Sequence, residues 1–164
     1  MLTGILTGAP IWVWPLLVVL ITLGLLASKS RTRPSLPIYL YWLLGFISLN
    51  AVNSLAPAPL VWAAFGAAYL LGAGLGYQFQ RRIIIGKSAG RVSLKGEWLS
   101  MGVFMMIFWM NFVGGVISAI SPDAYASSAY HCVFATVAGM AAGSFIGRAL
   151  RVFITPSTPD PAGE

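Results

Sequence analysis

The sequence predicts an all-α membrane protein, a bundle of five transmembrane helices with the N-terminus outside and the C-terminus in the cytoplasm. Three observations support this: the composition, the length of the uncharged runs and the placement of the basic residues. Of the 164 residues, 58% are hydrophobic and only 9% are charged, with a mean hydropathy of +0.82. Soluble domains carry roughly a quarter charged residues. Ten basic and four acidic side chains cannot cover a soluble core of this size, which excludes soluble, disordered and nucleic-acid-binding proteins.

Uncharged runs set the helix count. They cover residues 1–28, 34–80, 98–122 and 124–147. One membrane helix needs about 20 apolar residues, so the second run holds two helices, separated by the turn at Pro57 and Pro59. We expect helices over about 10–28, 37–56, 60–80, 97–120 and 127–150, forming a single domain over 1–154. The Pro-rich segment 155–164 is expected to be a disordered cytoplasmic tail.

Local signals support each element in order. Pro10 and Pro15 fall in the first turns of the first helix, where proline costs least. Lys29 is the first basic residue and follows that helix, so we expect no cleavable signal peptide. Between the third and fourth helices, Arg82–Ile85 and Arg91–Leu94 flank a glycine-containing turn and predict a short cytoplasmic β-hairpin. Ser121, Pro122 and Asp123 end the fourth helix.

Orientation follows from the positive-inside rule. The ten basic residues fall in 29–33, 81–95 and 148–151, which five helices place on one side. Asp123 is the only charge expected on the opposite side. The side rich in basic residues is therefore predicted to be cytoplasmic.

Small residues recur every four positions in two helices and predict close helix packing. One set lies in the third helix and one in the fifth: Ala64, Ala68, Gly72 and Gly76; Ala135, Gly139, Gly143 and Gly147. Such faces let helix backbones approach closely in lipid. The alternatives are a hinge or a homodimer seam. Each set of small residues ends shortly before basic residues. This shared pattern also suggests a weak parallel repeat, in which helices four and five repeat helices two and three.

Polar residues within the expected helices are the candidate binding residues. Asn50, Asn53, Asn111 and His131 all fall in the outer half of the membrane. If they converge, they form an outward-facing polar pocket; otherwise they form hydrogen bonds between helices. Glu97 begins the fourth helix, where its carboxylate complements the helix dipole and can pair with Lys95 or Arg91.

Known catalytic motifs are absent from the sequence. It has no P-loop, GxSxG, HExxH or CxxC pattern. With one cysteine, Cys132, and one histidine, we expect no metal site and no catalytic residues. The sequence predicts no cofactor and no enzymatic activity.

Three segments resemble an uncharacterised family of small bacterial inner-membrane proteins, a domain of unknown function. They are Thr3–Trp14, Val92–Leu99 and Gly143–Arg151. The helix–hairpin–helix plan is also loosely similar to small membrane proteins of cytochrome c biogenesis. The resemblance implies a multi-pass protein of the bacterial inner membrane and carries no activity.

Two functions are compatible with these patterns. The first is a non-enzymatic accessory or scaffold protein, or a small oligomer, that acts through helix–helix packing. Its partners would be the lipid bilayer and another membrane protein or itself, with no nucleic acid. The alternative is a binding or permeation protein for a small neutral or lipidic ligand, which would use the outward-facing polar pocket.

Overall fold

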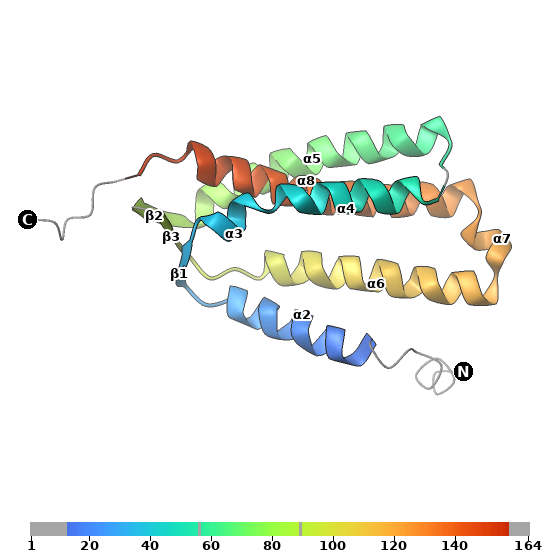
Figure 1. The fold of residues 1–164 in the computed structure, drawn as a ribbon, viewed down its shortest axis with the longest axis horizontal. Helices are drawn as coiled ribbons and strands as arrows, with labels where there is room; N and C mark the ends of the chain where they lie inside the picture. Colours follow the sequence, from blue (N-terminus) through green and yellow to red (C-terminus); the bar gives the residue numbers. More distant parts are fainter. Residues whose placement is uncertain (1–12, 56, 89, 158–164) are drawn as a thin grey trace, which may run out of the picture.

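The computed structural model describes residues 13–55, 57–88 and 90–157, and most of these residues are helical (Figure 1). The helices are α2 (Val13–Ala27), α3 (Leu36–Tyr39), α4 (Trp42–Asn53), α5 (Pro59–Ile83), α6 (Leu99–Ile120), α7 (Pro122–Tyr125) and α8 (Ser128–Ile154). Helices α5, α6 and α8 are long and apolar enough to cross a membrane, and α2 and α4 are shorter apolar helices. Residues 10–12 of the first predicted helix and 158–164 of the predicted tail lie outside the described residues.

The second predicted helix is not continuous, which corrects the expectation of one helix over 37–56. Helix α3 ends at Tyr39 and helix α4 begins at Trp42. Between them, the amides of Tyr41 and Leu43 bond to carbonyl oxygens three residues earlier, in the tighter 3₁₀ pattern. The break turns the Tyr41 ring onto Phe145 of α8, at a centroid distance of 5.3 Å. The ring of Tyr41 thus connects the break to α8.

A three-stranded antiparallel sheet replaces the predicted two-stranded hairpin. Strands β2 (Ile84–Ser88) and β3 (Arg91–Leu94) form the hairpin, and β1 (Arg31–Pro34) pairs with the other edge of β3. Gly90 turns the hairpin with a φ of 80°, a left-handed conformation that glycine adopts without strain. The hairpin begins two residues later than expected because Arg82 and Ile83 continue helix α5. A two-stranded hairpin is marginal alone, and the third strand completes it.

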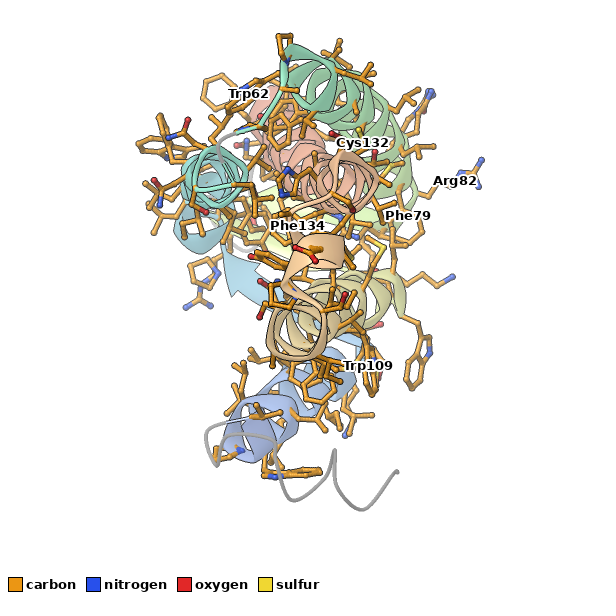
Figure 2. The ribbon with its side chains drawn as sticks, turned by 90° about the vertical axis from the view of Figure 1, so that its right-hand side faces the viewer. Trp62, Phe79, Arg82, Trp109, Cys132 and Phe134 are labelled. Atoms are coloured by element: carbon orange, nitrogen blue, oxygen red, sulfur yellow. The ribbon has the colours of Figure 1, made fainter. Side chains whose placement is uncertain are left out.

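Helix α8 lies at the centre of the bundle. Seen end-on, it has α4 and α5 on one side and α6 on the other, with α2 beyond α6 (Figure 2). Two apolar clusters fill the spaces around it. One joins Val52 of α4 and Phe65 of α5 to Ala135; the other joins Val103 of α6 to Phe145. The sheet packs through Val92 onto Val152, at the end of α8.

The basic residues lie at one end of the molecule. The three strands lie at the same end as the last turns of α5 and α8 (Figure 1). All ten basic residues belong to this end, within the segments 29–33, 81–95 and 148–151. Asp123 lies in α7, at the opposite end. The sequence-based grouping of basic residues is therefore present in three dimensions.

Candidate functional site

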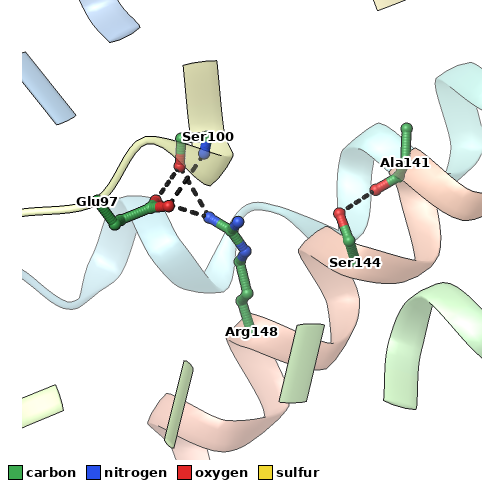
Figure 3. Close-up of polar contacts among 5 residues, drawn as sticks. All are labelled: Glu97, Ser100, Ala141, Ser144 and Arg148. Atoms are coloured by element: carbon green, nitrogen blue, oxygen red, sulfur yellow. Dashed lines mark hydrogen bonds and ion pairs between the residues drawn. The ribbon is translucent and has the colours of Figure 1, made fainter. Parts of the chain in front are cut away.

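A buried ion pair joins the start of α6 to α8. The Nη1 atom of Arg148 lies 3.1 Å from Oε1 of Glu97, and the two side chains are only 4% and 8% exposed (Figure 3). Removing one partner of an enclosed ion pair leaves an uncompensated charge, which costs about 3–5 kcal/mol. The pair therefore makes the association of α6 with α8 depend on two specific side chains.

Ser100 forms hydrogen bonds with both members of the ion pair. Its backbone amide donates to Oε2 of Glu97 at 3.0 Å, and its hydroxyl donates to Oε1. The same hydroxyl oxygen accepts from Nη1 of Arg148 at 2.8 Å. Glu97 thus has the helix-capping role expected from the sequence, but its charge partner is Arg148. Lys95 and Arg91, the two partners considered from the sequence, are exposed.

Backbone contacts between two loops fix the position of Glu97. The Glu97 amide donates to the carbonyl of Ala27 at 2.9 Å, and the Gly96 amide donates to Oγ of Ser30 at 3.3 Å. Gly96 itself lies directly against the backbone of Ser28, where any β-carbon would overlap the carbonyl oxygen. The end of α2 therefore holds the segment that leads into α6.

Arg148 has hydrogen-bond donors that the ion pair does not use. Its Cζ lies 5.6 Å from the centre of the Phe79 ring, in a cation–π contact. Its Nε and Nη2 atoms are buried, and no residue of the described chain accepts a hydrogen bond from them. Buried donors without a partner are costly, and ordered water commonly satisfies them.

A small cavity of about 30 Å³ adjoins the pair. Its polar lining consists of Tyr41, Gln80, Lys95, Glu97, Ser100 and Arg148. Gln80 is 2% exposed, so this amide also faces the interior. A cavity needs roughly 10–15 Å³ to hold one water molecule, so this one has room for water.

A second arginine of α8 is attached to α5. Nη1 of Arg151 donates to the hydroxyl of Tyr77 at 3.0 Å, and its Cζ lies 5.2 Å from the centre of that ring. The last turns of α8 are thus joined to α6 by Arg148 and to α5 by Arg151.

The four polar residues of the predicted pocket lie on three helices: α4 carries Asn50 and Asn53, α6 carries Asn111 and α8 carries His131. Asn50 and Asn53 are exposed on α4, and His131 is half-buried on the first turn of α8. Asn111 donates to the carbonyl of Ile107 in its own helix at 2.8 Å. Asn53 comes nine residues after Leu44, so it lies on the opposite side of α4 from the residue that packs against the cluster of Val103 and Phe145. Across the described residues, no hydrogen bond joins any two of the four.

The small residues of α5 and α8 face each other along the two helices. Gly72 and Gly76 lie against the carbonyl oxygens of Met140 and Ser144. Gly139, Gly143 and Gly147 lie against those of Phe65, Tyr69 and Ala73. Any β-carbon at these five glycines would overlap the opposite backbone, which is the close backbone approach that small residues permit between membrane helices. Ala68 and Ala135 are buried in the same region, whereas Ala64 is half-buried.

Sequence reasoning missed the Glu97–Arg148 pair because Arg148 was assigned with the other basic residues as an orientation signal. One signal was present: Arg148 follows Gly147, the last of the small residues that recur every four positions, and is therefore on a helix expected to pack closely. In the described residues, no three His, Cys, Asp or Glu side chains gather in a way that could hold a metal ion.

No family model, curated protein or solved structure matches the chain. The resemblance to small inner-membrane proteins stays a prediction.

Proposed function

We propose that the chain is a five-span protein of the bacterial inner membrane that acts without catalysis, as a scaffold or accessory subunit, through helix–helix contacts. The observation that carries this proposal is that the buried charged groups of Glu97 and Arg148 bind each other. Both oxygens of Glu97 are occupied by Ser100 and Arg148, so the one buried carboxylate among the described residues ties α6 to α8. A general acid or base must instead reach a substrate proton.

The surface of the helices supports the same proposal. Large apolar side chains are exposed on every long helix, among them Leu71 and Leu75 of α5, Trp109 of α6 and Val133 of α8. In a membrane these groups face lipid or another helix. Helices α5, α6 and α8 can each span the bilayer, and we place α2 and the α3–α4 pair as the other two spans.

The alternative function depends on a polar pocket formed by Asn50, Asn53, Asn111 and His131. No observation favours it: Asn111 bonds within its own helix, and no hydrogen bond among the described residues joins any two of the four. The water-sized cavity beside Arg148 lies at the sheet end and belongs to the ion-pair cluster.

Blue-native electrophoresis of native membranes solubilised in mild detergent tests the scaffold role. The tagged chain, expressed at its native level, should migrate in a discrete complex well above its 17.5 kDa monomer mass. Arg148→Met should reduce this complex, because it loosens α6 from α8, whereas Asn50→Ala, an exposed matched control, should leave it unchanged. A chain that is only monomeric at native levels would contradict the proposal.

A further inference from the structure

Three basic residues gather around the segment that leads into α6. Lys95 lies in this segment, and its amide donates to the carbonyl of Ile83, at the end of α5, at 2.8 Å. Arg82 directly precedes Ile83 and therefore lies beside Lys95. On the other side, Gly96 lies against the chain that follows α2, where a β-carbon would be 2.9 Å from the carbonyl carbon of Lys29. The fold thus brings together the backbones of Lys29, Arg82 and Lys95 from three separate segments.

No acid of the described chain neutralises this basic cluster. Its three side chains are exposed, and none of them forms an ion pair with a described residue. The described chain contains two acids, Glu97 and Asp123. Glu97 is buried and binds Arg148, and Asp123 lies in α7 at the opposite end of the molecule (Figure 1). The basic cluster therefore presents unneutralised positive charge at the surface, and Figure 2 shows its arginine pointing away from the bundle.

An apolar surface continues from the basic cluster along α5. Leu75 and Leu71 come seven and eleven residues before Arg82, so all three residues lie on one face of the helix. Each of the two leucines is 64% exposed. Trp98, beside the cluster at the start of α6, is 63% exposed, and tryptophan is enriched at the headgroup level of membranes. Cations, an indole ring and an apolar row therefore follow one another in the order that a phospholipid requires.

We infer that the basic cluster of Lys29, Arg82 and Lys95 binds the phosphate of an anionic phospholipid, whose acyl chain lies along Leu75 and Leu71. Lysine and arginine bind phosphate through charge-assisted hydrogen bonds, and basic pockets between membrane helices bind anionic headgroups. A zwitterionic headgroup brings its own ammonium group next to the three cations, so the cluster selects lipids with a net negative charge. The inference rests on the proposed function, because it requires the sheet end to lie at the membrane surface.

The bound lipid also has a consequence for stability. Like charges on neighbouring segments repel one another, and a phosphate among them replaces this repulsion by attraction. The three cations belong to the chain after α2, to the end of α5 and to the segment before α6. An anionic headgroup should therefore strengthen the association of these three segments, and neutral lipid should not.

Native mass spectrometry of the full chain in a neutral detergent tests the inference. The first bound phosphatidylglycerol should be held at least fivefold more tightly than phosphatidylcholine with the same acyl chains. One basic residue near an anionic membrane surface strengthens binding about fivefold, so Arg82→Gln should weaken this first step by about that factor. Arg91→Gln is the matched control, because Arg91 is exposed at the same end of the molecule but lies in β3, outside the cluster. Equal affinity for the two lipids, or equal weakening by the two substitutions, overturns the inference.

A second measurement separates lipid binding from folding. Phosphatidylglycerol should raise the thermal unfolding temperature of the unmodified chain more than phosphatidylcholine does, and Lys29→Gln, in a different segment from Arg82, should reduce this gain. An equal gain from both lipids overturns the inference.

Glycerol phosphate, which has the phosphate but no acyl chain, identifies the source of the phosphate. It should not displace phosphatidylglycerol at equal concentration, and displacement would assign the cluster to a soluble phosphate compound and overturn the inference. Resistance to carbonate extraction distinguishes the failures. An inserted chain without preference for phosphatidylglycerol contradicts only the lipid site, whereas an extractable chain also contradicts the proposed function.

Discussion

Nζ of Lys87, in strand β2, donates a hydrogen bond to the backbone carbonyl of Val152 at 2.9 Å, although 65 residues separate them. The same ammonium group donates to the carbonyl of Thr155 at 2.9 Å and to that of Phe153 at 3.4 Å. A helix leaves its last carbonyls without partners inside the helix, and a cation there also complements the helix dipole. Lys87 thus attaches the sheet to the end of the central helix.

We expect Lys87→Met to loosen this attachment. The change keeps the length and apolar stem of the side chain but removes the charge and all three donors to α8. Hydrogen bonds from charged groups contribute about 1.5–3 kcal/mol, so the last turn of α8 should exchange its amide hydrogens at least tenfold faster. Hydrogen-exchange mass spectrometry measures this, with exposed Arg91→Met as the matched control. Unchanged exchange in 148–155 would contradict the role of Lys87.

Gly143→Leu should disrupt the α5–α8 pair. A β-carbon at Gly143 would overlap the Tyr69 carbonyl, and backbone cannot yield as a flexible side chain can. Overpacking costs about 1–3 kcal/mol where neighbours can shift, and we expect at least that here, seen as a lower unfolding temperature in detergent. Gly115→Leu is the matched control because nothing lies within 4 Å of that position on α6. Equal unfolding temperatures for the two variants would show that close packing at Gly143 is not required.

Glu97 and Arg148 should be coupled in a double-mutant cycle. Glu97→Gln and Arg148→Met alone each leave one buried charge without its partner, and each should destabilise the chain by about 3–5 kcal/mol. The double variant encloses no charge there and should be less destabilised than the two single effects added together. Denaturant unfolding in mixed micelles measures all four proteins. Additive single effects would mean that the pair does not interact.

The sequence contained enough to predict the three long helices α5, α6 and α8, because uncharged runs, prolines and basic residues are local signals. The four-residue spacing of Gly72 and Gly76 also placed both on one helix face, and that face packs against α8 in the structure. The pairing of β1 with β3 could not be read in this way. Thr32 and Pro34 lie in a short basic segment with no strand-like alternation, and only the free edge of β3 gives them a partner.

The candidate site was harder to predict than the helices. Glu97 and Arg148 are 51 residues apart, and no periodic pattern relates them. The contact depends on the three-dimensional convergence of the α6 start with α8, which no local pattern in the sequence encodes. The four polar residues first considered were chosen by depth alone. Depth does not determine direction around a helix, and Asn53 lies on the opposite side of α4 from Leu44, which packs in the bundle.

Topology reporters test the predicted orientation. Because all ten basic residues lie at the sheet end, that end should remain in the cytoplasm, as the positive-inside rule requires. A fluorescent protein that folds only in the cytoplasm should be bright when fused after Glu164. Alkaline phosphatase, which is active only in the periplasm, should be active when inserted after Asp123 and inactive after Gly90. Fusions at Glu164 and Gly90 that report opposite sides of the membrane would rule out five spans. The segment between these two positions would then cross the membrane an odd number of times, whereas the five-span arrangement places two spanning helices, α6 and α8, between them. A Glu164 fusion active as alkaline phosphatase, with Gly90 on the same side, would instead reverse the orientation and leave the fold unchanged.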